Sequence, residues 1–524
     1  MKMRNLLLAG LACASAAPLS ASEVAPRAET VTPTSLSVRA VMQHVRQAVG
    51  LTNLTRFGNA FAIVQADSDG AKRQLSFGTR RGEVSTGREF VDDGAIAWQA
   101  DARRNLAVPA SIRQREKLAW PLWVRGYWWL NPASGFAAQL SQSESNQKEI
   151  AIALSRPDGV VGATVYVDRS SWLPTRVVVP YERGPFTERY SDYRSVNAVK
   201  FPFAIATDYR NRSQSTVLSV TALKSKSAFS KPAFAPDHGF DAKRPAALTT
   251  RDGVPFPNGV PGHVYVRASV DGGPEGWWHF DSGADTSIID ESVARTLGME
   301  VVGTHRSSGA DGKVREGTWR KAKGFTVGRL RIDNAVFRAM NLSGNNAPPG
   351  ERRMGTIGYD VLARAVVEWG RNGHDVRICD PGQYRLPGGA RWQRLRYIDS
   401  TPAFPATAEG HAGLFQIDTG TVAAVDFTKS FTERNRLLES RKTQAMNALG
   451  SGGTYAVQVG QLKTLQLAGR VFRDLEVSFR TGGFSREGSA GTIGRDVLNR
   501  FTLVFDYPHQ RLAFLPVGRA GHCG

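Results

Sequence analysis

The feature that most constrains this chain is an internal repeat. The segment GTIGYDVLAR at 355–364 returns as GTIGRDVLNR at 491–500, with eight of ten positions identical. Upstream, HFDSGA at 279–284 returns as QIDTGT at 416–421, which aligns Asp281 with Asp418. Both pairs of segments are displaced along the chain by the same length to within one residue, so the chain contains two copies of one unit. Such a duplication predicts two similar lobes placed one after the other.

Short strands precede both aspartates. HVYVRASV and GWWHF are predicted to form a hairpin that runs into Asp281, and TPAFPATAEGHAGLFQI is predicted to do the same into Asp418. Farther along each copy lies a glycine-rich segment, SSGADGKVREG at 307–317 and LGSGGTYAVQVG at 449–460. Glycine-rich segments between strands favour turns, so both are predicted to be mobile hairpins.

The two aspartates suggest one chemistry. An Asp-(Ser/Thr)-Gly loop presents a carboxylate on a tight turn, and the hydroxyl can bond across to the other loop. If a pseudo-twofold axis brings Asp281 and Asp418 together, like charges prevent both from ionising and one proton is shared. A water held between them is then the expected nucleophile. One carboxylate takes its proton and the other protonates the substrate carbonyl, which hydrolyses a peptide bond without a metal or a covalent intermediate.

These motifs resemble the aspartic proteases, of both the retroviral and the pepsin type, over about residues 255–518. The resemblance implies that Asp281 and Asp418 are the catalytic pair. It also implies a set of residues that lock and brace the two loops: Ser282, Gly283, Thr419, Gly420, Thr421, Ile357, Gly358, Ile493 and Gly494. Pepsin-type enzymes carry a Tyr in the flap of the first lobe, and 307–317 has none. Two glycine-rich hairpins are closer to a retroviral dimer fused into one chain.

The predicted fold is mainly β. Residues 1–22 combine Lys2 and Arg4 with the apolar run LLLAGLACA and small residues, which is typical of a signal peptide. A lipidated Cys13 is the alternative reading.

Residues 23–224 are predicted to be a separate β-rich domain, with a helix at VRAVMQHVRQAV near its start. Residues 225–254, rich in Pro, Ser and charge, are predicted to be a linker. Residues 255–390 and 391–524 are the two lobes of a bilobal, pseudo-twofold aspartic-protease β-barrel fold.

The first domain carries phrases such as VYVDRSSWLPTRVVV and ERYSDYRSVNAVKFPF, which resemble the periplasmic carriers of outer-membrane lipoproteins. That resemblance implies a curved, incomplete β-barrel around a helix, and acyl chains or the envelope surface as partners. WPLWVRGYWWL at 120–130 is either a membrane or peptide platform or the ordinary core of a β-domain.

Net charge, histidine spacing and the cysteines bear on which partners and cofactors the chain could have. The net charge of +20 is scattered along the chain, which favours a cationic surface facing an anionic envelope over a nucleic-acid partner. Histidine spacing indicates no metal site, and no cofactor or transmembrane span is expected. Cys379 and Cys523 could form a disulfide or remain free thiols.

The sequence therefore predicts an exported aspartic endopeptidase that acts on polypeptides. It is expected to be periplasmic or secreted, and association with the outer membrane is left open. The alternative is a periplasmic carrier of lipid or peptide on an inactive protease-like scaffold.

Overall fold

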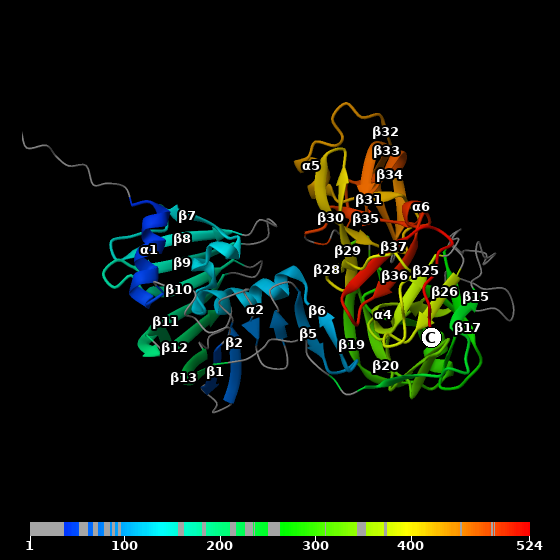
Figure 1. Cartoon of the computed structure of the whole chain (residues 1–524), viewed down its shortest axis with the longest axis horizontal. Helices are drawn as coiled ribbons and strands as arrows, with labels where there is room; N and C mark the ends of the chain where they lie inside the picture. Colours follow the sequence, from blue (N-terminus) through cyan, green and yellow to red (C-terminus); the bar gives the residue numbers. More distant parts are fainter. Residues whose placement is uncertain are drawn as a thin grey trace, which may run out of the picture.

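We describe the protein from a computed structural model of the chain (Figure 1). The structure describes residues 36–51, 61–66, 72–77, 84–85, 90–92, 96–155, 162–180, 185–196, 198–209, 216–225, 234, 236–249, 263–309, 311–342, 353–370, 375–450, 453–483, 486 and 488–524. The predicted signal peptide and Cys13 lie outside the described residues.

The N-terminal domain is built on one antiparallel sheet. Among the described residues it has thirteen strands, in the order β6-β5-β4-β3-β2-β1-β13-β12-β11-β10-β9-β8-β7, and no pairing in this part of the chain joins β6 to β7, so the sheet stays open. The strands are β1 (Phe61–Ala66), β2 (Lys72–Phe77), β3 (Val84–Ser85), β4 (Phe90–Asp92), β5 (Ala97–Asp101), β6 (Leu106–Pro109), β7 (Ala137–Ser141), β8 (Glu149–Ser155), β9 (Ala163–Asp168), β10 (Pro174–Val179), β11 (Phe186–Val196), β12 (Val199–Tyr209) and β13 (Thr216–Ser225).

Two helices pack against this sheet. Helix α1 (Val38–Val49) begins after the capping Ser37 and ends at Gly50, whose φ of 85° suits glycine. Helix α2 (Ile112–Arg125) begins at Ser111 with a capping box. The aromatic segment at 120–130, which spans the end of α2 and the residues after it, is buried, so it is core rather than a surface platform. Its buried members are Trp120, Trp123, Tyr127, Trp128 and Trp129.

Each lobe that follows has its own large sheet. The first lobe has ten described strands, in the order β14-β22-β21-β16-β17-β24-β18-β23-β20-β19: β14 (His238–Phe240), β16 (Tyr265–Val270), β17 (Gly276–Phe280), β18 (Ile288–Asp290), β19 (Glu300–Ser308), β20 (Val314–Lys321), β21 (Gly324–Val327), β22 (Leu330–Asp333), β23 (Val336–Met340) and β24 (Arg353–Ile357). The second has eight, in the order β28-β29-β30-β35-β31-β34-β33-β32: β28 (Arg396–Ile398), β29 (Thr401–Ala408), β30 (His411–Ile417), β31 (Val425–Phe427), β32 (Thr443–Gly450), β33 (Gly453–Leu467), β34 (Arg470–Arg480) and β35 (Gly491–Ile493).

The centres of the two lobe sheets have the same topology. In the first lobe β17 runs parallel to β24, β24 antiparallel to β18, and β18 parallel to β23. In the second, β30, β35, β31 and β34 repeat these directions in the same order. Short helices follow at matching places: α3 (Glu291–Thr296) and α4 (Tyr359–Leu362) in the first lobe, α5 (Lys429–Arg434) and α6 (Arg495–Leu498) in the second. The two aspartate loops therefore leave equivalent strands.

A third sheet joins the lobes. It has six described strands, in the order β15-β26-β25-β36-β37-β27: β15 (Ala247–Thr249), β25 (Val366–Trp369), β26 (Asp375–Cys379), β27 (Gln393–Arg394), β36 (Thr502–Asp506) and β37 (Arg511–Leu515). Strand β25 of the first lobe pairs antiparallel with β36 of the second. The Cys379–Cys523 disulfide ties the C-terminal segment to this sheet. The two lobes thus share a continuous backbone hydrogen-bond network.

The segment predicted as a linker contributes to these sheets. Within 225–254, β14 pairs with β22 and β15 pairs with β26. Strands of three residues are too short to show an alternating pattern, so composition alone suggested a structureless segment. The predicted mainly β fold class is confirmed, since strands dominate all parts of the described chain.

Candidate active site

The structure brings the two aspartate loops together. Asp281 follows β17 and Asp418 follows β30. Between them, the Ser282 amide donates to Thr419 Oγ1 at 2.9 Å, and the Thr419 amide donates to Ser282 Oγ at 3.0 Å. Each hydroxyl also donates to a carbonyl of the other loop's strand, Ser282 to Ile417 and Thr419 to Phe280. These reciprocal bonds are buried and hold both loops at one separation.

Glycine is required two residues after each aspartate, because the carboxylate of the other loop lies too close for a side chain there. A Cβ built on Gly283 would lie 2.5 Å from Asp418 Cγ, and one built on Gly420 would lie 2.6 Å from Asp281 Cγ. Instead, each glycine amide donates to its own loop's carboxylate, at 2.8 Å in both lobes. Both carboxylates are thus held by backbone donors and directed toward the opposite loop.

The Thr-Ile-Gly segments brace these loops from beneath. The Asp281 amide donates to the Ile357 carbonyl at 3.0 Å, and the Asp418 amide donates to the Ile493 carbonyl at 3.1 Å. Side chains at Gly358 or Gly494 would collide with loop carbonyls, at 2.6 Å from Thr286 O and 2.2 Å from Ala423 O. The sequence-predicted residues therefore all lie in or directly under one pair of loops.

The electrostatics of the pair are asymmetric. Desolvation, the nearby charge of Asp418 and a hydrogen bond between the two carboxyl groups raise the pKa of Asp281 well above its ordinary value. On the other side, Thr421 Oγ1 donates to Asp418 Oδ2 at 2.9 Å. The equivalent position in the first lobe is Ala284, which has no hydroxyl to donate. An added donor favours a negative charge on Asp418, so the arrangement favours the proton on Asp281.

This asymmetry predicts a pH-dependent stability. Because the folded state raises the pKa of Asp281, the protein loses stability as the pH rises from the unfolded value of about 3.9 toward the raised one, by about 1.4 kcal/mol per pH unit. In Asp281→Asn this loss is removed. We expect the thermal midpoint of Asp281→Asn to equal that of the parent near pH 3 and to exceed it increasingly toward neutral pH. Thermal unfolding followed across this pH range checks the sign, and a difference that grows toward acid pH contradicts it.

Sequence reasoning missed a second polar network in the first lobe. Asp285 forms a bidentate ion pair with Arg338, at 3.0 Å for both contacts. Although desolvation opposes it, Arg338 holds the pKa of Asp285 below its ordinary value. Asp360 accepts from Thr286 Oγ1 at 3.1 Å and from the Ser287 amide. The signal was present, since Asp360 belongs to the repeated GTIGYD segment, but its partners are far away in sequence.

The second lobe differs at the corresponding position. When the two aspartate loops are aligned, Val422 takes the place of Asp285, and its apolar side chain is 44% exposed. Where the first lobe has a charged pair beside its loop, the second has an exposed valine. The two sides of the site are therefore chemically unlike.

Both predicted hairpins are present and meet at their tips. Strands β19 and β20 form the first and β32 and β33 the second. A Cβ built on Gly453 would lie 2.9 Å from Asp311 Oδ2, so the two tips touch. In the second hairpin Tyr455 donates to Asp426 Oδ2 at 3.0 Å, and Arg480 Nε donates to the same oxygen at 2.6 Å. The only tyrosine of the two predicted hairpin segments is thus fixed to its own lobe.

Two further properties of the described residues bear on the site. Within them, no group of three or more His, Cys, Asp or Glu side chains is arranged to hold a metal ion. No helix in the described part of the chain is both long and apolar enough to cross a membrane.

Comparisons with known proteins agree with the sequence motifs. Residues 266–361 match a family model described as aspartyl protease. A search of curated proteins finds no significant match. Among solved structures, an aspartic proteinase from Irpex lacteus shares 13% identity over 54% of this chain and 98% of its own, with a TM-score of 0.34. A LolA superfamily protein from Nitrosomonas europaea shares 17% identity over 37% of this chain and 96% of its own, with a TM-score of 0.25.

The family match is the finding that bears on the site. The matched residues include the Asp281 loop and the Ile357–Gly358 pair. They end one residue past Asp360, so the match covers the polar network of the first lobe as well. The predicted resemblance is thereby confirmed: over residues 266–361, this chain is similar to the aspartyl proteases.

Proposed function

We propose that the protein is an exported aspartic endopeptidase in which Asp281 and Asp418 activate one water. The observation that carries the proposal is the pair of interlocked loops, in which the hydroxyls of Ser282 and Thr419 cross between lobes and each glycine is packed against the opposite carboxylate. A structural turn needs no such partner. Two acids forced together in this way hold one proton between them, which is the requirement for combined acid and base catalysis.

The asymmetry of the pair assigns roles to its members. Asp418, whose negative charge Thr421 supports, removes a proton from the water as it attacks the peptide carbonyl carbon. Asp281, which holds the shared proton, donates it to the carbonyl oxygen as the tetrahedral intermediate forms. Collapse of that intermediate breaks the C–N bond as the amine nitrogen receives a proton from Asp418, while one hydroxyl of the diol returns its proton to Asp281 and becomes the carbonyl of the new carboxylic acid. The pair then returns to its starting state with one proton.

Thr421 offers a test of this assignment. In Thr421→Val the ionised form of Asp418 loses one donor. A hydrogen bond to a charged group is worth about 1.5–3 kcal/mol, so the acidic limb of the pH–rate profile should move to higher pH by about one to two units. Thr421→Ser keeps the hydroxyl and serves as the matched control. If Thr421→Val shifts only the alkaline limb, the roles of the two aspartates are reversed.

The substrate and compartment follow from other parts of the chain. The two hairpins, one from each lobe, touch at their tips and would have to part to admit a substrate. An extended polypeptide is the substrate class that could then lie between them. The Cys379–Cys523 disulfide in the described structure suits an oxidising compartment, and the signal-like start of the sequence agrees with export. We therefore include periplasmic or secreted location in the proposal.

The decisive experiment is a cleavage assay. The purified protein is incubated with a denatured, unrelated protein from about pH 3 to pH 8, and products are identified by mass spectrometry. We expect cleavage that is blocked by a peptide mimic carrying a hydroxyl in place of the attacking water. A protein that cuts nothing across this range, and does not bind the mimic, would favour the carrier alternative. For that alternative, the described interior of the N-terminal domain is packed with its own aliphatic and aromatic side chains and gives no support for an acyl-chain ligand.

A further inference from the structure

A hairpin of the N-terminal domain reaches into the first lobe. Strands β5 and β6 form this hairpin, and Figure 1 shows them at the edge of the N-terminal sheet, beside the first lobe. Leu106 is buried in the same hydrophobic cluster as the core of the lobes. The carbonyl of Ala107 accepts from the Tyr359 hydroxyl at 2.9 Å, and Trp98 contacts Tyr397 edge to face at 5.8 Å between ring centroids. The contact between the hairpin and the lobes thus combines buried apolar packing with a hydrogen bond.

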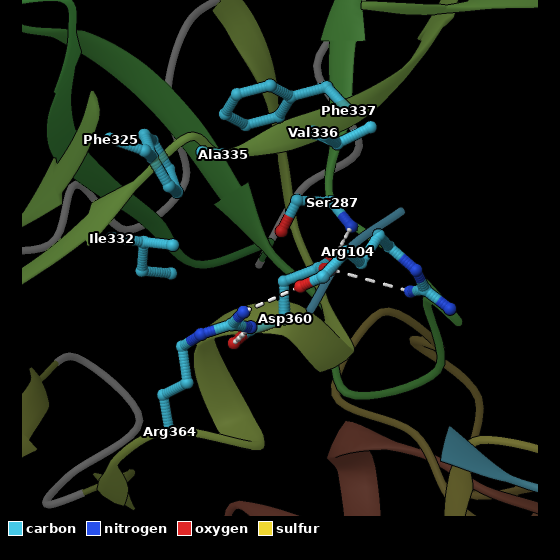
Figure 2. A pocket seen from close by; sticks show the side chains of 9 residues that line it. All are labelled: Arg104, Ser287, Phe325, Ile332, Ala335, Val336, Phe337, Asp360 and Arg364. Atoms are coloured by element: carbon cyan, nitrogen blue, oxygen red, sulfur yellow. Dashed lines mark hydrogen bonds and ion pairs between the residues drawn. The ribbon is translucent and has the colours of Figure 1, made fainter. Parts of the chain in front are cut away.

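Arg104 sits at the turn of this hairpin, with a side chain only 9% exposed. Its Nε is 2.7 Å from Asp101 Oδ2 in its own hairpin. From Nη1 it donates to the Asp285 carbonyl at 3.0 Å and lies 3.4 Å from Asp360 Oδ1 (Figure 2). Although burial alone opposes it, the charges of Asp360 and Asp101 raise the pKa of Arg104. The guanidinium is therefore a fixed cation shared between two domains.

The groups that Arg104 contacts hold the Asp281 loop. Asp285 is four residues after Asp281 in sequence. Asp360 accepts from Thr286 Oγ1 and the Ser287 amide, which continue the same loop. Figure 2 shows Arg104, Ser287 and Asp360 gathered in one small pocket, with Arg364 beside them. One cation thus fixes the loop both at a backbone carbonyl and through the carboxylate that binds the next two residues.

The second lobe has no such arrangement. Asp496, which matches Asp360 in the repeated segment, has a side chain that is 55% exposed and lies 3.7 Å from Arg500 in its own helix region. Ala423 and Ala424 stand where the first lobe has Thr286 and Ser287. The buried polar network is therefore specific to the lobe that contacts the N-terminal domain.

We propose that Arg104 is a positioning residue for the Asp281 loop, so that the first lobe becomes catalytically competent only when the N-terminal hairpin is docked. This inference rests on the proposed peptidase function. Packing of Leu106 and Trp98 would fix the domains to one another without regard to the loop. The bond from Arg104 to the Asp285 carbonyl and its approach to Asp360 instead act on the backbone that carries the candidate acid. Buried charge pairs of this kind are costly to leave half made, which makes docking and loop geometry interdependent.

The test compares three variants of the full-length protein. Arg104→Ala removes the cation, Arg104→Lys keeps the charge without the planar set of donors, and Arg103→Ala is the matched control. Arg103 is exposed in the same turn and lies over the Trp319 ring at 5.4 Å. With active sites titrated by the hydroxyl-bearing mimic, we expect kcat per site to fall about tenfold or more in Arg104→Ala, with KM changed less than kcat. Arg104→Lys should recover part of the loss, and Arg103→Ala should match the parent.

A second readout does not depend on activity. Hydrogen exchange of the amides in 281–288 should become faster in Arg104→Ala, while that of the equivalent segment 418–425 should stay unchanged. Faster exchange in both segments, or in neither, overturns the proposal, as does an unchanged kcat per titrated site. If the parent cleaves no peptide but exchange rises only in 281–288, the positioning role is supported and the peptidase function is wrong. The two failures are therefore distinguishable.

Discussion

Asp281→Asn and Asp418→Asn are each expected to reduce kcat by a factor on the order of a thousand or more, since neither acid works as acid or base without the other. The structure explains why the loss should be this large. Both carboxylates are held by backbone amides at 2.8 Å and face the opposite loop, so removal of either one leaves the other without its partner. The measurement is kcat on a defined peptide, with each variant's folding checked by circular dichroism.

The effects of the two substitutions should not add. In Asp281→Asn/Asp418→Asn we expect about the same residual rate as in either single variant, because residues that act as a unit lose their whole contribution at the first removal. Ser→Ala changes on the exposed surface serve as preparation controls. Near-parental cleavage by a clean preparation of Asp418→Asn would show that the pair is not the catalytic centre.

Removal of the disulfide is expected to have the largest effect on stability. Cys379 and Cys523 are buried and separated by 144 residues, and closing so long a loop restricts the unfolded chain strongly. We expect Cys379→Ala/Cys523→Ala to lower the free energy of unfolding by about 2–5 kcal/mol, which corresponds to a fall of the thermal midpoint on the order of ten degrees. The C-terminal segment should loosen first, because the disulfide ties it directly to the first lobe at Cys379. The hydrogen bond from Arg329 Nη1 to the Gly524 carbonyl, at 2.7 Å, should be lost with it.

A reducing agent provides the control for this prediction. It should lower the thermal midpoint of the parent to that of the double variant and leave the variant itself unchanged. A parent that is insensitive to reduction under conditions shown to free both thiols would contradict the expected contribution. Cleavage at low temperature should survive in the variant, since neither cysteine is part of the aspartate loops.

Local patterns were enough to predict much of this molecule. The hairpins that run into the two aspartates are β16–β17 and β29–β30, and VRAVMQHVRQAV is helix α1 to the residue. These elements have clear periodicity and turn signals, so their local sequence decides them. The aspartate loops were found differently, by comparing the chain with itself. Each loop alone is an ordinary turn sequence, and only the matching offsets mark it out.

The rest depends on partners that are distant in sequence. Nothing near Arg104 indicates that its guanidinium reaches Asp285, which is 181 residues away. The strands β14 and β15 are defined only by the edges they pair with. The pairing of Cys379 with Cys523 likewise remained open, because two cysteines in a sequence carry no information on their separation in space. Contacts of this kind follow from the assembled fold and not from any window of residues.

The sheet that joins β25 to β36 has a consequence for how a substrate would be read. A symmetric dimer must place the same side chain at both ends of its cleft, and so cannot tell one direction of a bound chain from the other. Here the halves are held in a single chain, and substitutions on one side are independent of the other. Asp285 with Arg338 lies beside the first aspartate loop, and the exposed Val422 takes the equivalent place beside the second. In the proposed peptidase, a peptide and its reversed orientation meet different chemistry, so fusion of the two halves has given the cleft a polarity.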